Sequence, residues 1–275
     1  KLGWFDLTTA ATMVGSQFVM YRGMGAKIIY ALTRLMLQNN AKYGFEVILP
    51  PYMIAEKGLF NAGELPKFKG AYYKIEQEDL CLIPTAEVSL TNIHANQILN
   101  KEQLPLRYTS WTSCFRREAG GYGSTERGLI RIHQFEKVEI YSISTPEESQ
   151  QEQQRMLECA QVLLKQLGLH YRVTLLAAQD CSFQSTKTFD IEVWLPGQDR
   201  YYEVSSCSNC SDFQARRAGI RYRTAPDAKP SLVHTLNASA LALPRLMVAI
   251  MENFQQADGS VVLPEVLQKA VNDLW

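Results

Sequence analysis

Residues 112–141 read TSCFRREAGGYGSTERGLIRIHQFEKVEIY, and this stretch decides the fold. Two alternating segments flank a glycine-rich middle, which predicts two strands joined by a loop. In the first arm, residues 113–118, the side chains of Arg116 and Glu118 fall on one face. Glycine suits a loop that moves or lets a ligand approach its backbone. The loop glycines are Gly120, Gly121, Gly123 and Gly128.

The returning arm has two different faces. One is apolar and can pack against helices; it is dominated by Ile130, Ile132, Val138 and Ile140. The other combines cations, carboxylates, an aromatic ring and an imidazole: Leu129, Arg131, His133, Phe135, Lys137, Glu139 and Tyr141. This face is either a charged, solvent-facing surface or a sheet floor for an anionic ligand that carries a ring. Phe135 and Glu139 lie roughly 13 Å apart at ~3.3 Å per residue, which leaves room for a long ligand along the strand.

The bulk numbers describe an ordinary globular chain. At 275 residues, 46% of them hydrophobic and 20% charged, it can bury a large core. No apolar run approaches the ~18–20 residues of a membrane span, so no membrane partner is predicted. The formal net charge is zero, so any contact with nucleic acid must use local patches rather than an overall positive field.

The cysteines indicate the compartment. Six of them are scattered along a chain with an ample core, which favours free thiols and a cytoplasmic location over a disulfide framework. Cys207 and Cys210 have the spacing of half a zinc site, but no second pair follows at the usual distance.

Two segments carry a resemblance to a known family. Residues 115–118, Phe-Arg-Arg-Glu, resemble the F-R-x-E signature of class II aminoacyl-tRNA synthetases, called motif 2. Residues 127–139 and the block at 203–217, EVSSCSNCSDFQARR, resemble seryl-tRNA synthetases in particular. The resemblance covers essentially the whole chain and implies an α+β fold, an antiparallel sheet flanked by helices.

The same resemblance implies one catalytic domain over residues 1–275. Motif 1 lies at about 25–53, motif 2 at about 112–141 and motif 3 at about 235–256, and motif 1 builds a homodimer interface in the family. Nothing in the chain resembles the family's N-terminal helical arm, so we expect the arm to be absent. Motif 3 departs from the common pattern: Ala238, Ala240 and Pro244 replace glycines. The motif 2 loop departs at residues 124–126, Ser-Thr-Glu.

Site residues follow from matching positions. Thr85 is also a plausible helix N-cap, with Glu87 in the first turn. The resemblance makes Arg116 and Arg245 catalytic. It implies serine binding by Thr85, Ala86, Glu87, Arg116, Glu139 and Ser239. It implies ATP binding by Arg116, Arg117, Glu118, Ile132, Phe135, Glu203, Val204, Ser205, Ser206 and Arg245. Mg²⁺ would be held by Glu203 and Ser206, whose oxygen atoms suit a hard cation.

The implied activity is that of a serine–tRNA ligase, which forms seryl-adenylate from L-serine and ATP and transfers the seryl group to tRNA(Ser). The tRNA for selenocysteine is a further candidate partner. Two other readings stay open from the sequence. One is an arm-less paralogue that activates an amino acid for a carrier protein. The other is a catalytically silent homologue that only binds.

Overall fold

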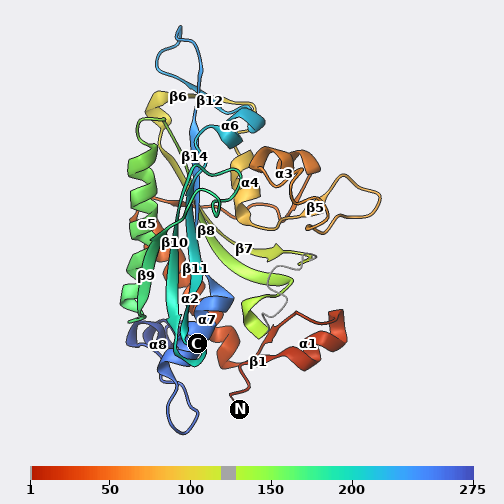
Figure 1. Cartoon of the computed structure of the whole chain (residues 1–275), viewed down its shortest axis with the longest axis vertical. Coiled ribbons are helices and arrows are strands. Elements are labelled where there is room, and N and C mark those ends of the chain that lie inside the picture. The colour runs from red at the N-terminus through yellow and green to blue at the C-terminus, as the bar shows by residue number, and fades with distance from the viewer. Residues whose placement is uncertain (1, 119–127) are drawn as a thin grey trace.

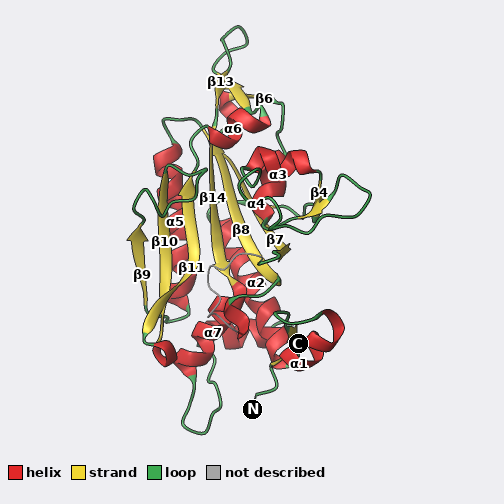
Figure 2. Cartoon of the chain, turned by 45° about the vertical axis from the view of Figure 1, so that its right-hand side comes forward, coloured by secondary structure: helices red, strands yellow, loops and turns green. Residues whose placement is uncertain are grey.

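The computed structural model describes residues 2–118 and 128–275, and a seven-stranded sheet forms its centre (Figures 1 and 2). Every neighbouring pair is antiparallel except the first two strands, which are parallel. This confirms the predicted antiparallel sheet. Its order is β3 (Glu46–Val47), β7 (Leu106–Phe115), β8 (Gln134–Ser144), β14 (His234–Ala242), β11 (Arg200–Asn209), β10 (Lys187–Leu195) and β9 (Tyr171–Leu175).

One face of the sheet carries the main hydrophobic core. Val138 and Ile140 of β8 and Val204 of β11 pack there against apolar helix faces. The helices are α2 (Met24–Lys42), α5 (Ser149–Gln166), α7 (Leu243–Phe254) and α8 (Glu265–Asn272). Figure 2 shows α2 and α5 behind the strands. The helical spacing of Ile28, Leu32 and Met36 predicts an amphipathic helix at residues 25–43, and in α2 all three are buried.

Shorter elements complete the fold. On the opposite face lie α3 (Glu56–Ala62), α4 (Ala86–Asn92) and α6 (Phe213–Ala218), beside two smaller apolar clusters. The outlying pieces are β1 (Phe5–Asp6), α1 (Leu7–Val14), β2 (Met20–Tyr21), β4 (Met53–Ile54), β5 (Cys81–Leu82), β6 (Ile98–Asn100), β12 (Arg221–Arg223) and β13 (Ser231–Leu232), with single turns at η1 (Lys101–Gln103), η2 (Gly128–Ile130) and η3 (Pro196–Gln198).

The two strands of the central hairpin have other bounds than predicted: they extend further at the end away from the loop and stop short of the loop itself. β7 extends back to Leu106 and stops at Phe115, so Arg116 and Glu118 lie just beyond the strand. β8 begins at Gln134, and the preceding residues form η2 and a turn. Leu129 therefore lies in η2 and not in the predicted strand; it is buried in the core and also borders a cavity on the polar side of the sheet. The loop residues Gly120, Gly121 and Gly123 and the departures at 124–126 lie outside the described residues.

Three sequence patterns predict helix boundaries that the structure corrects. The apolar spacing at Leu243, Leu246, Met247, Ile250 and Phe254 predicts a helix from about Ser239, but residues 239–242 continue β14 and α7 begins at Leu243. Residues 145–148 read as a capping box that opens a helix, but they form a turn in which Thr145 Oγ1 donates to Glu148 Oε2, and α5 begins at Ser149. Residues 1–22 read as irregular but contain α1, and the sequence gives no prediction for α8.

None of the helices in the described ranges combines the length and apolar character that a bilayer crossing requires. All six cysteines are free thiols in the structure, and Cys207 and Cys210 are both buried.

Candidate active site

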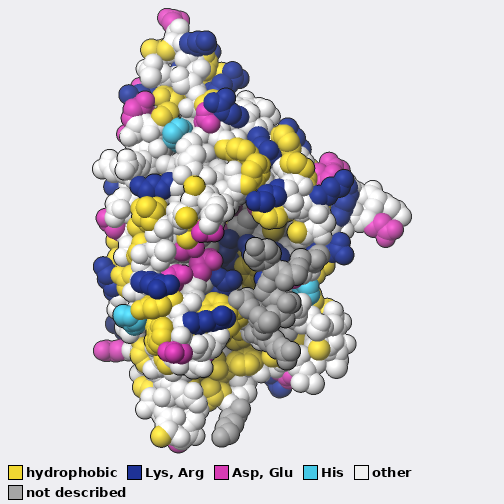
Figure 3. All heavy atoms as spheres, in the orientation of Figure 1, with side chains coloured by type: hydrophobic (Ala, Val, Ile, Leu, Met, Phe, Trp, Pro, Cys, Tyr) yellow, Lys and Arg dark blue, Asp and Glu magenta, His cyan; other side chains and the backbone are white. Residues whose placement is uncertain are grey.

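Two adjoining cavities open on the polar face of the sheet, with volumes of about 500 and 200 Å³. They share Arg116, Glu118, Lys137, Glu203 and Ser239 as walls. Near the centre of the face in Figure 3, acidic and basic side chains gather beside this hollow. Most of the predicted site residues line one or both cavities: Thr85, Glu87, Arg116, Glu118, Ile132, Phe135, Glu139, Glu203, Ser206, Ser239 and Arg245.

Strand alternation explains why β8 supplies the floor. Val138 and Ile140 point into the core, so Lys137 and Glu139 point the opposite way, into the larger cavity. Ser239 of β14 is paired with Glu139 across the sheet, which brings the two predicted serine ligands side by side. The faces predicted for residues 135–141 are therefore confirmed.

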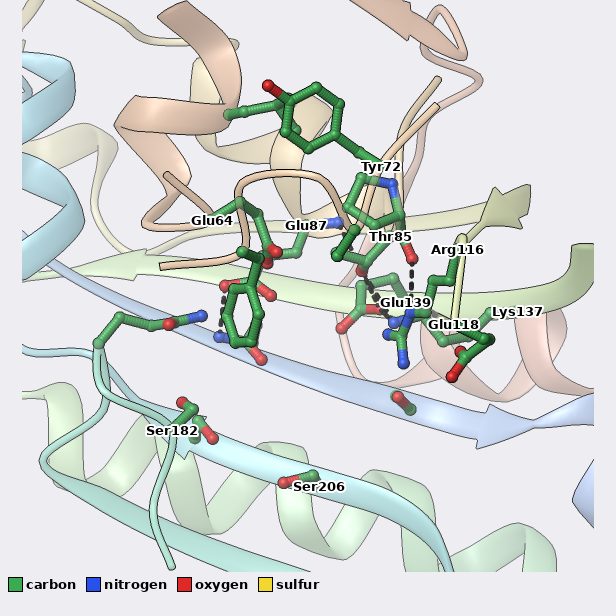
Figure 4. A pocket seen from close by; sticks show the side chains of 18 of the residues that line it. Glu64, Tyr72, Thr85, Glu87, Arg116, Glu118, Lys137, Glu139, Ser182 and Ser206 are labelled. Atoms are coloured by element: carbon green, nitrogen blue, oxygen red, sulfur yellow. Dashed lines mark hydrogen bonds and ion pairs between the residues drawn. The ribbon is translucent and has the colours of Figure 1, made fainter. Parts of the chain in front are cut away.

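Lys137, Glu139 and Thr85 form a closed polar triangle on this floor (Figure 4). Lys137 Nζ lies 2.6 Å from Glu139 Oε2 and donates to Thr85 Oγ1 at 2.8 Å. Thr85 Oγ1 in turn donates to Glu139 Oε2 at 3.1 Å. Burial would lower the pKa of Lys137, but the Glu139 carboxylate outweighs it and the pKa is raised. A buried ammonium–carboxylate pair with a hydroxyl is suited to hydrogen-bonding a small polar ligand.

Glu87 lies at the first turn of α4, where Thr85 caps the helix as predicted: Thr85 Oγ1 accepts from the Glu87 backbone N–H at 3.2 Å. Glu87 Oε1 accepts a hydrogen bond from Gln214 Nε2 at 2.7 Å and another from Asn237 Nδ2 at 2.9 Å. Burial, with the nearby carboxylates of Glu139 and Glu64, raises the pKa of Glu87 to about 8. A bound cation would favour the charged form of this carboxyl group.

Arg116 reaches into both cavities from the end of β7 (Figure 4). Its Nε donates to Pro84 O at 3.3 Å, and its guanidinium lies 5.1 Å from the centre of the Phe135 ring. Glu118 forms an ion pair with Arg131 at 2.5 Å. The Phe135 ring and the Glu118 carboxylate, which the resemblance assigns to ATP, are thus in contact with arginines in this structure.

The far wall combines Arg245, Glu203 and Ser206. Arg245, in the first turn of α7, donates from Nη1 to Glu203 O at 2.8 Å and lies 3.5 Å from Glu203 Oε2. Asp190 of β10 is the register partner of Ser206, and its Oδ1 is buried without a hydrogen-bond partner among the described residues. Burial and the neighbouring Glu203 raise the pKa of Asp190 to about 6. This oxygen-rich wall is suited to a hard divalent cation.

Four predicted residues lie elsewhere. The side chains of Ala86 and Val204 are fully buried in apolar clusters. Ser205 is buried and donates to Ser239 O at 2.5 Å, on the core side of β11. Arg117 is exposed, and its backbone N–H donates to Ala71 O. Helix periodicity turns Ala86 away from the cavity that Thr85 and Glu87 line. A bulge in β11 opposite Ile191 and Glu192 breaks the strand alternation, so Glu203 and Ser206 both face the cavity while Val204 and Ser205 between them do not.

Other lining residues were not assigned from the sequence. Glu64 and Gln184 come from loops that carry no recognisable motif, and Asn237 and Ser208 are buried polar residues of β14 and β11. Lys137 was placed on the correct face but given no role. Burial raises the pKa of Glu64. The only local signal for any of these was the polar character of Asn237 and Ser208 within apolar strands.

Three comparisons with known proteins agree with this geometry. A family model described as the tRNA synthetase class II core domain (G, H, P, S and T) matches residues 72–254. The chain belongs to the class II tRNA synthetase core family. The recognised class and the fold are thereby confirmed.

Individual proteins of this family are similar to the chain over nearly its whole length. The chain is 51% identical over 268 residues to a serine–tRNA ligase of Desulforapulum autotrophicum, which covers 97% of this chain and 63% of that protein. It superimposes with a TM-score of 0.95 and 42% identity on a seryl-tRNA synthetase from Pyrococcus horikoshii crystallised with ATP, over 98% of this chain and 60% of that one. It also superimposes on a cytoplasmic serine–tRNA ligase from Naegleria fowleri in complex with AMP, with a TM-score of 0.92 and 29% identity. That superposition covers 98% of this chain and 64% of the other. The chain thus spans somewhat under two thirds of these relatives.

Proposed function

We propose that this chain is the catalytic part of a serine–tRNA ligase. The observation that carries the proposal is the pair of joined cavities: one has a buried hydroxyl-binding floor at Glu139 and Thr85, the other is walled by Arg245 and Phe135, and Arg116 stands between them. Serine and ATP would meet at Arg116. The relatives named as serine–tRNA ligases support the assignment.

Two steps follow. A serine carboxylate oxygen attacks the α-phosphorus of ATP, the bond to the β-phosphate breaks, and pyrophosphate leaves. A ribose hydroxyl at the tRNA end then attacks the seryl carbonyl, and AMP leaves. Arg116 would bind the α-phosphate and the serine carboxylate, because fixed cations stabilise the charge that spreads over phosphorus. Positioning in one cavity supplies most of the remaining rate enhancement, and no side chain acts as nucleophile.

ATP would lie in the smaller cavity, with Phe135 and Arg245 on either side of adenine and Glu118 accepting from its amino group. Binding in this way requires Arg116 to leave the Phe135 face and Arg131 to share Glu118. Glu203 and Ser206 would hold Mg²⁺, which neutralises phosphate charge when bound. The described residues hold no group of three or more His, Cys, Asp or Glu that could bind a metal ion by themselves. Phosphate and water oxygens would supply the remaining ligands of the ion.

The Glu139 carboxylate and Ser239 would hydrogen-bond the serine hydroxyl, with Thr85 and Glu87 near the amino group. A site built to pair a hydroxyl rejects alanine, because its buried polar groups would be left unpaired. Glu139→Ala is expected to lower kcat/KM for serine about 100-fold or more in serine-dependent ATP–pyrophosphate exchange. Glu136→Ala, in the same strand but outside both cavities, is the matched control. Exchange at the wild-type rate in Glu139→Ala would remove Glu139 from the site.

Transfer distinguishes the proposed ligase from its rivals. Purified protein carrying seryl-adenylate should aminoacylate tRNA(Ser), and the tRNA for selenocysteine is to be assayed beside it. Transfer to a carrier protein alone would support the paralogue, and absence of ATP binding would support a silent homologue. We also propose a homodimer that acts in the cytoplasm.

A further inference from the structure

The structure assigns Gln214 as a positioning residue for the amino-acid subsite: it holds Glu87 so that one carboxylate oxygen is left for the substrate's α-ammonium group. The inference rests on the proposed function for the identity of that substrate. It concerns a residue in α6, which does not line either cavity and touches the site only through Glu87.

All four hydrogen-bonding positions of the Gln214 amide are used, and its side chain is fully buried. Its Oε1 accepts from Tyr141 OH at 2.9 Å and from Thr235 Oγ1 at 2.7 Å. Its Nε2 donates to Ala62 O at 2.9 Å and to Glu87 Oε1 at 2.7 Å. A side-chain amide with both donors and both lone pairs satisfied cannot rotate without breaking several bonds.

The orientation of this amide is fixed by chemistry. The Ala62 carbonyl can only accept, so the nitrogen of Gln214 must face it. The second N–H of the same nitrogen then points at Glu87, and the two hydroxyls on the other side must donate to Oε1. The Ala62 carbonyl therefore determines, through Gln214, that Glu87 meets a donor, and Tyr141 and Thr235 satisfy the opposite oxygen.

The consequence for Glu87 is an uneven use of its two oxygens. Gln214 and Asn237 both donate to Oε1, and none of the described residues donates to Oε2. Two donors on one oxygen stabilise the charged carboxylate against its burial, and Gln214 lowers the pKa of Glu87 that burial raises. Oε2 therefore stays available for a cation in the cavity. Binding a cation there would pair the buried carboxylate oxygen and remove the free-energy cost of leaving it unpaired.

Glu87 also faces other charged and titratable groups, so the effect of Gln214 must be separated from theirs. Lys137 favours the charged form of Glu87, and two carboxylates oppose it. The groups that face it from the surrounding elements are Glu64, Glu139, Lys137, Tyr141 and Cys210. A variant confined to Gln214 keeps all five groups, and among them Tyr141 loses the oxygen to which it donates.

The test compares Gln214→Met with Gln153→Met. Methionine keeps the approximate volume and removes the amide. Gln153 is an equally buried glutamine whose Nε2 donates to two backbone carbonyls, but it lies in α5 outside both cavities. We expect KM for serine in ATP–pyrophosphate exchange to rise about 10- to 100-fold in Gln214→Met, equal to about 1.4–2.8 kcal/mol, with KM for ATP unchanged within twofold. Gln153→Met should leave both KM values unchanged.

The pH profile adds a readout that a purely structural role would not move. In Gln214→Met, the rise of kcat/KM for serine with pH should shift to higher pH, because Glu87 ionises with more difficulty. Equal increases in KM for serine and ATP, or an unchanged KM for serine in folded protein, would overturn the assignment. Thr235→Val removes only one donor to Gln214 and should give the same shifts at smaller size, so the test stands even if Gln214→Met fails to fold.

A ligand-free measurement separates this inference from the proposed function. The titration of Glu87 can be followed by NMR of ¹³C-labelled glutamate carboxyl groups, with Glu87→Gln for assignment. Gln214→Met should raise its pKa whether or not the chain activates serine. An unchanged titration would refute the link between Gln214 and Glu87, whereas a raised one together with absent exchange in the wild type would refute only the proposed function.

Discussion

At the scale of single residues, the buried carboxyl group of Glu87 in the cavity wall lowers the stability of the fold as pH rises. Its pKa is raised to about 8 from 4.5, so the folded state binds a proton that the unfolded chain has released. Stability from this group is therefore present at acidic pH and is lost as pH rises between those values. We expect Glu87→Gln, which cannot ionise, to become more stable than the wild type by about 2–4 kcal/mol on going from pH 5 to pH 9.

Urea unfolding of the ligand-free protein at several pH values measures this difference. Glu78→Gln, at an exposed position, is the control, and its stability relative to the wild type should not change with pH in this way. A wild-type stability that stays parallel to that of Glu87→Gln across the range would mean that the buried carboxyl is not strained by its environment. The same variant should lose serine activation, since its charge is the proposed partner of the α-ammonium group.

At the scale of elements, an ion pair fastens α5 to the sheet. Arg107 of β7 contacts Glu152 of α5 through Nε at 2.7 Å and Nη2 at 2.5 Å, and Ser142 Oγ also donates to Glu152 at 3.1 Å. Glu152 is only 5% exposed, so removing Arg107 leaves a buried carboxylate whose remaining cationic partner, Arg155, lies farther away at 3.6 Å. Arg107→Met is expected to lower the free energy of unfolding by about 2–4 kcal/mol.

Arg172→Met is the matched control for that prediction. Arg172 pairs with Glu192 at 2.5 Å on the edge of the sheet, but its side chain is 54% exposed. Solvent screens such a pair, so its loss should cost under about 1 kcal/mol in the same denaturation experiment. Similar costs for the two variants would show that the depth of burial does not set the value of the Arg107 pair.

The secondary structure also explains why motif 3 has alanine and proline in place of the family's glycines. Ala238 and Ala240 lie in β14 with their methyl groups buried, and Pro244 fits the first turn of α7. A strand interior favours alanine over glycine, and the first helical turn tolerates proline. Ala238→Gly is therefore expected to lower the free energy of unfolding by about 1 kcal/mol, measured in urea, and an increase would contradict this account.

At the scale of the whole molecule, motif 1 leaves apolar side chains in solvent. Leu49 is 74% and Met53 52% exposed, and Tyr30 and Val47 are exposed nearby in motif 1. Several exposed large apolar side chains within one motif are consistent with an interface. We expect sedimentation to give a dimer and Leu49→Asp to shift it towards monomer. Val262→Asp, at an exposed apolar site outside motif 1, is the control, and a monomeric wild type would refute the proposed dimer.

The sequence by itself determined the sheet class, the two strands of the central hairpin and the face of β8 that carries Phe135, Lys137 and Glu139. Alternation has a fixed period of two, so a short segment is enough to place those side chains. Sequence reasoning failed at boundaries such as residues 239–242, where the sheet ladder extends a segment whose local pattern also suited a helix. It also failed for Ala86, which helix periodicity turns away from the cavity, and for Val204 and Ser205, where a bulge in β11 breaks the alternation.

Only the tertiary structure decided which residues support the site from outside its motifs. Gln214 and Glu87 are 127 positions apart, and Glu64 and Asp190 come from a loop and a strand that no local pattern connects to the cavity. Burial then sets their chemistry, because a carboxylate removed from water responds to whichever donors the packed chain brings within about 3 Å. That distance is a property of the folded sheet and helices together, and no single segment encodes it.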